Sequence, residues 1–407
     1  MRVLLLTQFF PPEIGAAAER MGSLARFIAD RAELTVLAPV PSYPWSKTIK
    51  KKEWPAEDAD GRPYRLKRCY KIPKRGNLVI RLLSEIHYAG NCLLHILIAR
   101  RYDLIIISIP SFFLGFVGPV MRWLRGSEYV LDIRDLYPDS LKDVGILQEG
   151  VLYRLLKKAE AWLYRRAKLV SIVNETWQPA IAKHARDIVV VPNGLDLDQL
   201  LSRKAIPPSL TAQQKELLAS RFVVVYIGNI GRFYDFDPFL SAAADIGQAD
   251  VKQILFLFVG EGSQRTELEN RIKAQTVKNC AVWDPIPSEF LISFLGLCHI
   301  GIVGWRANTR FLENGVPNKV YEYLAADLDV IACIPGTLPG ILTASGRVHQ
   351  FANQDRAGIV AKILKIQERG GKIQTPPDLL ETFSRKRHFS QLWSHIEPDD
   401  SNENKNI

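Results

Sequence analysis

Short apolar runs alternate with helical patterns twice along this 407-residue chain, and this alternation limits its fold more than any other feature. Each apolar run has the length of a buried strand and is followed by a turn that contains glycine or proline. The clearest runs are Arg2–Thr7 and Glu33–Ala38 in the first half, and Phe222–Ile227 and Ile254–Val259 in the second. Strand, turn, helix and strand in this order predict two successive α/β domains, each with a parallel sheet.

The chain divides near residue 196, where a polar stretch with Pro207 and Pro208 separates the two alternations. We therefore predict an N-terminal domain over 1–196 and a C-terminal domain over 197–376. A last helical pattern covers about 377–396. The segment 397–407 is acidic and rich in asparagine, and we expect it to be disordered.

Several common kinds of site lack their sequence signatures. The five cysteines form no CxxC pair, which argues against a disulfide framework and favours a reducing compartment. The seven histidines are scattered without HExxH, so we expect no metal site. No GxGxxG follows the first strand, and no GxSxG elbow is present. The opening segment is interpreted as a strand and not as a signal peptide.

The formal net charge is +10, and much of the excess lies between Lys47 and Arg75 among aromatic residues. Such a stretch can stack on the bases of a nucleic acid, lie at a membrane interface or form a solvated loop. The helical pattern from Leu152 to Arg165 combines an apolar stripe with basic side chains, and it can pack on the core or face a membrane. No recognised nucleic-acid motif accompanies the charge, so we expect no nucleic-acid partner.

A helix that opens at Pro317 carries the most informative chemistry. Proline suits the first turn of a helix, and Tyr321 recurs at helical spacing with other apolar residues. Asn318, Lys319 and Glu322 share another face near the helix start. Helix N–H groups and a lysine suit phosphates, and a carboxylate one turn further can accept hydrogen bonds from a ribose. The alternative is a surface helix with a Lys/Glu pair.

Two glycine-containing turns and one aspartate also follow strands, where α/β domains place their ligands. Glycine lets backbone N–H groups approach a phosphate, Arg232 supplies charge for a leaving diphosphate, and Asp135 can grip a hydroxyl or assist proton transfer. Simple helix starts and a capping aspartate are the alternatives. The turns are Gly228-Asn229-Ile230-Gly231-Arg232 and Gly260-Glu261-Gly262-Ser263.

These motifs together resemble glycosyltransferase family 4. The resemblance runs from Met1 to about Ile396 and is closest to bacterial enzymes of surface-polysaccharide assembly, including N-acetylfucosaminyl transferase-like members. The matching pieces are FFPPEIGAAAERM, RDLYPDS, VPNGLD, YIGNIG, VGEGS and PNKVYEYLA. The family implies the GT-B fold, with two Rossmann-like domains facing across a cleft and the helix at 377–396 completing the first. It also implies a retaining transfer without a bound metal or other cofactor.

The resemblance also assigns roles to residues. Glu322 would hold the ribose, Arg232 and the helix start at Asn318–Lys319 would face the diphosphate, and Gly15 would let the first loop approach the reaction centre. The family places an acid eight positions before the second one. Here Asn314 occupies that position, with Glu313 beside it as the candidate sugar-binding acid. The Lys or Gln that commonly follows the arginine is replaced by Phe233-Tyr234-Asp235-Phe236.

The resulting hypothesis is a hexosyl or N-acetylhexosaminyl transferase that uses a UDP- or GDP-linked sugar. Its acceptor would be a lipid-linked glycan of O-antigen, capsule or exopolysaccharide, at an anionic membrane surface on the inner face of the cytoplasmic membrane. The alternative is a scaffold or partner subunit that keeps the fold and has lost catalysis.

Overall fold

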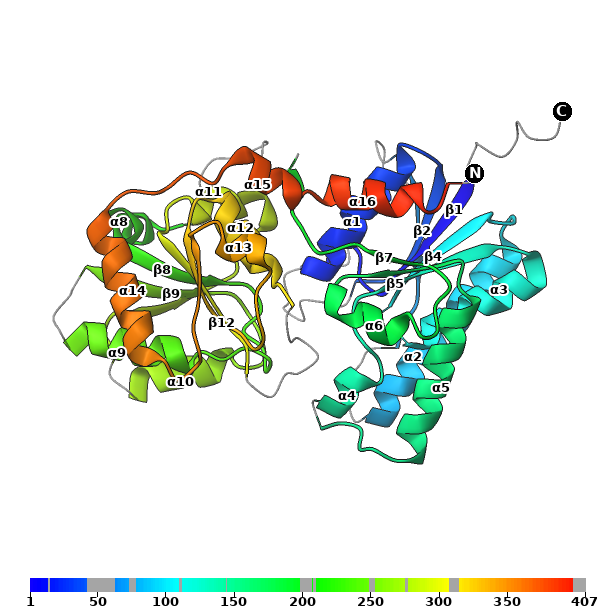
Figure 1. Ribbon diagram of the computed structural model, residues 1–407, viewed down its shortest axis with the longest axis horizontal. Coiled ribbons are helices and arrows are strands. Elements are labelled where there is room, and N and C mark those ends of the chain that lie inside the picture. The colour runs from blue at the N-terminus through cyan, green and yellow to red at the C-terminus, as the bar shows by residue number, and fades with distance from the viewer. Residues whose placement is uncertain are drawn as a thin grey trace. The chain divides into compact units, whose positions relative to one another are not determined.

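The computed structural model describes residues 1–13, 15–41, 63–72, 78–109, 112–143, 145–197, 207, 210–248, 253–274, 277–306 and 315–397. The chain forms two compact units (Figure 1). Unit 1 comprises Met1–Pro192 and Arg385–Ile407, and unit 2 comprises Asn193–Ser384. The prediction of two parallel-sheet α/β domains is confirmed.

The centre of unit 1 is a seven-stranded sheet in the order β3-β2-β1-β4-β5-β6-β7, with all neighbours parallel. The strands are β1 (Arg2–Leu6), β2 (Glu33–Pro39), β3 (Arg65–Cys69), β4 (Leu104–Ile109), β5 (Glu128–Ile133), β6 (Leu169–Ile172) and β7 (Ile188–Val190). The middle strands are buried along their whole length, as expected for a parallel sheet covered on both faces.

Helices cover both faces of this sheet (Figure 1). α1 and α16 pack on one face, and α2, α3 and α5 pack on the other. The helices are α1 (Ala16–Ala29), α2 (Leu78–Ile98), η2 (Phe112–Phe116), α3 (Val117–Arg125), α4 (Asp139–Asp143), α5 (Val151–Arg166), η3 (Glu175–Trp177), α6 (Gln178–Ile181) and α16 (Arg385–Ser394). In α1, Met21, Leu24, Ala25 and Ile28 follow the i, i+3, i+4, i+7 spacing and are fully buried.

Unit 2 repeats the design with a six-stranded parallel sheet in the order β10-β9-β8-β11-β12-β13. Its strands are β8 (Phe222–Ile227), β9 (Ile254–Val259), β10 (Cys280–Trp283), β11 (Ile300–Gly304), β12 (Asp329–Cys333) and β13 (Val348–Gln350). Its helices are α8 (Ala212–Ser220), α9 (Asp237–Gln248), α10 (Arg265–Ala274), η4 (Ser288–Phe290), α11 (Leu291–Leu295), α12 (Asn318–Ala325), α13 (Gly340–Thr343), α14 (Arg356–Arg369) and α15 (Pro377–Thr382). One core cluster lies under α11, α12 and α13, and the other lies under α9 and α14.

The prediction of a single helix over about 377–396 is wrong. The chain forms α15 and α16, separated by Phe383 and Ser384, and only α16 belongs to unit 1. Phe383 packs its ring against Tyr321, with centroids 4.9 Å apart, and its carbonyl accepts a hydrogen bond of 2.7 Å from the amide of Leu195. These long-range contacts end the first helix. Of the tail at 397–407, only Glu397 lies within the described residues.

Candidate functional site

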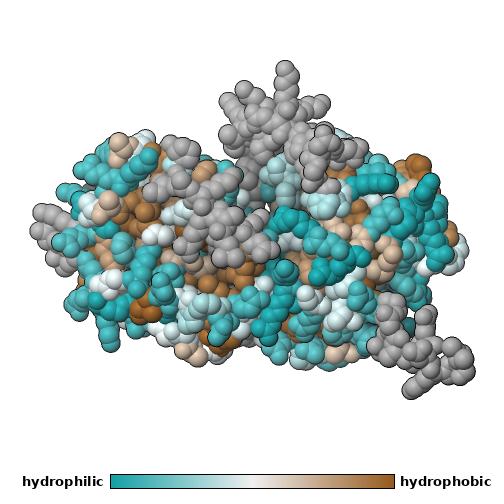
Figure 2. Space-filling model, turned by 90° about the horizontal axis from the view of Figure 1, so that it is seen from above, coloured by the Kyte–Doolittle hydropathy of each residue, from teal (hydrophilic) through white to brown (hydrophobic). Residues whose placement is uncertain are grey.

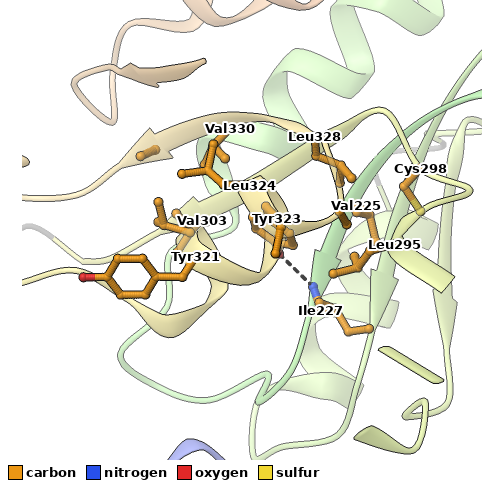
Figure 3. Close-up of a cluster of buried hydrophobic side chains, with 14 of the residues drawn as sticks. Val225, Ile227, Leu295, Cys298, Val303, Tyr321, Tyr323, Leu324, Leu328 and Val330 are labelled. Atoms are coloured by element: carbon orange, nitrogen blue, oxygen red, sulfur yellow. Dashed lines mark hydrogen bonds between the residues drawn. The ribbon is translucent and has the colours of Figure 1, made fainter. Parts of the chain in front are cut away.

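Helix α12 is fixed to the sheet of unit 2 by Tyr323. The Tyr323 hydroxyl accepts a hydrogen bond of 3.1 Å from the amide of Ile227 (Figure 3). It also donates one of 3.2 Å to the carbonyl of Ile302. A Cβ on Gly301 would lie 2.2 Å from the Tyr323 ring, so glycine makes the space for it. The start of α12 is thereby held beside the carboxyl end of β8.

The polar residues of α12 lie in its first two turns and are half-buried. Pro317 is the N-cap, with an extended backbone at φ −63 and ψ 139, and the helix itself begins at Asn318. Val320 and Leu324 are fully buried, whereas Lys319 and Glu322 are half-buried. The amide of Val320 donates a hydrogen bond of 3.0 Å to the carbonyl of Pro317. Helix geometry leaves the amides of Asn318 and Lys319 without partners within the helix.

The two predicted glycine turns contact each other through their backbones. A Cβ on Gly260 would lie 1.9 Å from the carbonyl oxygen of Gly228, and a Cβ on Gly262 would lie 2.2 Å from that of Ile230. Gly228 and Gly260 also have φ of +123° and +152°, which L side chains rarely adopt. The amide of Ile230 donates a 2.8 Å hydrogen bond to the carbonyl of Glu261. The structure therefore brings both turns together as one glycine-lined surface.

Lys319 lies across this surface against two tyrosines whose rings contact each other. A Cβ on Gly228 would lie 2.9 Å from the Lys319 ammonium nitrogen, so that nitrogen rests directly on the turn. The ammonium group lies 5.2 Å from the ring centroid of Tyr226 and 4.6 Å from that of Tyr234. It also donates a hydrogen bond of 3.1 Å to the Tyr234 hydroxyl. Cation–π attraction and this hydrogen bond hold the charge at the helix start.

Other predicted residues of unit 2 have distinct surroundings. The Arg232 side chain is exposed. The Asn229 side chain fills the space beside Gly231 and Gly262. Glu261 forms an ion pair with Arg265 at the start of α10. Its charge is therefore already paired.

The amide of Asn318 is a buried polar group without a hydrogen-bond partner in the described part of the chain. Both its oxygen and its nitrogen are removed from solvent. An amide has two donors and an acceptor, and leaving them unsatisfied costs free energy. This orphaned group at the first residue of α12 suits a ligand with complementary polar atoms. The predicted acid Glu313 and its neighbour Asn314 lie outside the described residues.

In unit 1, a hydrogen bond between neighbours of Asp135 and Gly15 links the two segments. Arg134 donates from Nη1 to the carbonyl of Ala17 at 3.2 Å, which links the end of β5 to the first turn of α1. Gly15 is the N-cap of α1, has φ +142° and has open space where a Cβ would be. Burial raises the pKa of Asp135 to about 6, against the opposing effects of Ser140 and Arg134. This carboxyl can therefore exchange a proton near neutral pH.

Sequence reasoning missed three side chains that shape these regions. No local pattern marks Tyr226 and Tyr234, because a tyrosine in or after a strand is usually a core residue. Arg20 has a usable signal, since an arginine on the apolar face of a helix needs buried partners. It donates hydrogen bonds of 2.9 Å to the carbonyls of both Val191 and Pro192, the last residues of the first segment of unit 1. Among the described residues, no group of three or more His, Cys, Asp or Glu is placed to hold a metal ion.

Two family models match the chain. The glycosyl transferase 4-like domain covers residues 15–194, and the model of glycosyl transferases group 1 covers residues 221–369. A curated relative, probable glycosyltransferase WbjE of Pseudomonas aeruginosa, is 23% identical over 273 residues. That match covers 65% of this chain and 66% of the relative, just under two thirds of its length.

Solved structures share the fold along nearly the whole chain. HepE of Anabaena, solved in complex with UDP and glucose, superposes with a TM-score of 0.68 at 16% identity and covers 97% of this chain and 99% of that one. Sucrose-phosphate synthase of Thermosynechococcus elongatus has a TM-score of 0.64 at 15% identity, with 98% and 95% covered.

Proposed function

We propose that this chain, which has the GT-B fold and matches a glycosyl transferase 4-like domain followed by a group 1 domain, is a glycosyltransferase. It transfers a hexosyl or N-acetylhexosaminyl group from a nucleotide-diphosphate donor to a growing, lipid-linked surface polysaccharide, with retention of configuration. The name of the relative, probable glycosyltransferase WbjE, supports the transferase activity, and the UDP bound by HepE supports the donor class.

The observation that carries the proposal is the position of Lys319 on Gly228. A cation, the start of a helix and a glycine-lined backbone surface converge there. Each of these favours a phosphate group, and together they suit a diphosphate. As the sugar leaves, negative charge develops on that diphosphate, and groups fixed in advance stabilise it without reorganisation. Arg232, exposed after the β8 turn, supplies a second cation in this proposal.

The remaining donor contacts come from α12 and from the segments before it. Glu322 accepts hydrogen bonds from the ribose hydroxyls one turn beyond Lys319, and the Asn318 amide finds partners on the ligand. Backbone groups of Gly260–Gly262 meet the edge of the base, while Glu313 remains the candidate for the sugar. No metal takes part in this proposal, because the Lys319 and Arg232 cations offset the diphosphate charge.

The acceptor is assigned to unit 1. A carboxyl with a pKa of about 6 is suited to hold a hydroxyl or to exchange its proton, and this supports Asp135 as the acceptor-side residue. Gly15, with open space at its Cα, admits a ligand close to the backbone. A lipid-linked acceptor places the enzyme on the inner face of the cytoplasmic membrane.

The decisive test is calorimetric titration of the full chain with UDP, GDP and their sugars. We expect one nucleotide to bind and Glu322→Ala to weaken it at least tenfold, the range of a lost charge-assisted hydrogen bond. Glu368→Ala, an exposed acid on α14, is the matched control and keeps wild-type affinity. Equal affinity in Glu322→Ala removes the ribose role. Binding without transfer from any sugar of the panel would favour the scaffold alternative.

A further inference from the structure

Exposed apolar side chains gather on three helices of unit 1. Most of the large hydrophobic side chains exposed in the described residues lie on α2, α3 and α5. These helices bury their other sides in one core cluster on the same face of the sheet. Single exposed hydrophobics are normal on a soluble surface, but a concentration on one layer marks an interaction site.

Helix α5 has an apolar ridge with cations along its flanks. Val151, Leu155 and Trp162 are 67%, 56% and 38% exposed, and their spacing puts them on one line of the helix. Arg154 and Lys158 are exposed beside that line. The guanidinium of Arg166 lies 4.7 Å from the ring centroid of Trp162 at the far end. An apolar ridge flanked by Lys and Arg is typical of helices that lie in a membrane interface.

The exposed side of α5 carries no carboxylate. The one acidic residue of the helix, Glu160, is 4% exposed. It accepts hydrogen bonds from Lys157 and from the hydroxyl of Tyr164. The positive charge of the helix surface is therefore not offset on the helix itself.

The neighbouring helices extend the apolar surface. On α2, Leu83, Leu94 and Ile98 are exposed, with Ile98 at 86%, and on α3 Trp123 is 83% exposed. Arg125 of α3 donates a hydrogen bond of 3.2 Å to the carbonyl of Ala99 just after α2. Helix α3 is joined to α5 at its other side, because Arg122 donates a hydrogen bond of 3.0 Å to the carbonyl of Arg166. We call the exposed side chains of these three helices the α2–α3–α5 surface.

The opposite layer of unit 1 differs. Figure 2 views the molecule from above, the side of α1 and α16 in Figure 1, and hydrophilic side chains predominate over that layer with only small separate brown patches. No helix in the described part of the chain combines the length and apolar content needed to cross a bilayer.

We propose that the α2–α3–α5 surface docks on a bilayer with anionic headgroups. The inference rests on the proposed function in one respect, since a lipid-linked acceptor requires the enzyme to work at a membrane. Tryptophan and leucine side chains enter the boundary between headgroups and acyl chains, and the flanking cations meet anionic lipid. A second copy of this chain suits the surface less well, because a two-fold contact would set the same cations against each other.

The test is flotation of the full chain with vesicles of phosphatidylcholine alone or mixed with phosphatidylglycerol. We expect binding to the anionic vesicles. Trp123→Ser and Leu155→Ser should each weaken it about tenfold, as expected for a buried apolar side chain. Arg154→Gln with Lys158→Gln should weaken it about 25-fold, roughly fivefold for each cation. Ile341→Ser and Ile373→Ser, both 46% exposed in unit 2, and Lys273→Gln with Lys365→Gln are the matched controls and should bind as wild type.

The outcomes separate this inference from the proposed function. Equal binding to neutral and anionic vesicles, or equal losses in the control variants, overturns the inference. So does a dimer in analytical ultracentrifugation that Trp123→Ser dissociates, because the surface then belongs to a second copy. Nucleotide binding is measured without vesicles on the same variants and should be unchanged. If the wild type binds no nucleotide, the proposed function is contradicted. The vesicle result would then still test the membrane-docking inference by itself.

Discussion

The ammonium group of Lys319 donates a 3.1 Å hydrogen bond to the hydroxyl of Tyr234, a residue 85 positions earlier in the chain. This hydrogen bond helps to hold the ammonium group over Gly228. Tyr234 belongs to the segment Phe233-Tyr234-Asp235-Phe236, which follows Arg232 where the resembled family commonly has a lysine or a glutamine.

Removal of the Lys319 charge should weaken binding of the nucleotide diphosphate. We expect Lys319→Met to lower affinity about tenfold to a hundredfold, since a charge-assisted hydrogen bond is lost while the side chain keeps most of its length. Tyr234→Phe keeps the ring and loses only the hydroxyl, so a loss of about two- to tenfold is expected. Calorimetry measures both, with Lys273→Met on α10 as the control. A Lys319→Met protein with wild-type affinity would remove this residue from the donor site.

Arg232 should affect turnover more than binding. Its exposed side chain is free to follow the charge that develops on the departing diphosphate, and we expect Arg232→Ala to lower kcat about ten- to a thousandfold. Initial rates at saturating donor measure this. Arg186→Ala, an exposed arginine of unit 1, should keep the wild-type rate. Wild-type turnover in Arg232→Ala would rule out the assignment.

Gly260 should not tolerate a side chain. A Cβ would lie 1.9 Å from the carbonyl oxygen of Gly228 and would also require a positive φ, so Gly260→Ala should lower the free energy of unfolding by more than about 1 kcal/mol. Gly90 is the control, since it lies inside α2 with open space around it. Gly90→Ala should be neutral or stabilising by up to about 1 kcal/mol. Urea denaturation compares the two, and equal stabilities would show that the turns can separate freely.

Asp135 should make stability depend on pH in the acid range. Its folded-state pKa of about 6 exceeds the ordinary 3.8, so the folded chain binds more protons than the unfolded chain between these values. The contribution is fully present below about pH 4 and is lost as pH rises through about 6, amounting to roughly 2–3 kcal/mol. Asp135→Asn should flatten this slope, and Asp187→Asn, an exposed aspartate, should not. Urea midpoints between pH 4 and 7 measure it, and a wild-type slope in Asp135→Asn would contradict the assignment.

The features that the sequence predicted well depend on local periodicity. The apolar positions of α1 and α12 recur every three or four residues and are buried where that spacing places them, and the spacing of glycines after β8 and β9 marked both turns. Each of these patterns is complete within one short segment, so no knowledge of the partner was needed.

The missed features depend on contacts between distant segments. The break at Phe383 arises because its ring packs on Tyr321 and its carbonyl pairs with Leu195. Lys319 of a helix contacts Tyr226 of a strand and Tyr234 of a loop. The sequence around each tyrosine does not indicate that a cation will lie against its ring. Periodicity within one segment carries no information on contacts between distant segments.

The return of α16 to unit 1 has a consequence for the order of folding during synthesis. Unit 2 is one continuous stretch, and its two ends are tied together where Leu195 meets Phe383. Unit 1 lacks part of its core until Phe389 and Trp393, which are synthesised after all of unit 2, reach α1. We therefore expect the second unit to finish folding on the ribosome first, while the earlier-made segment awaits its last helix.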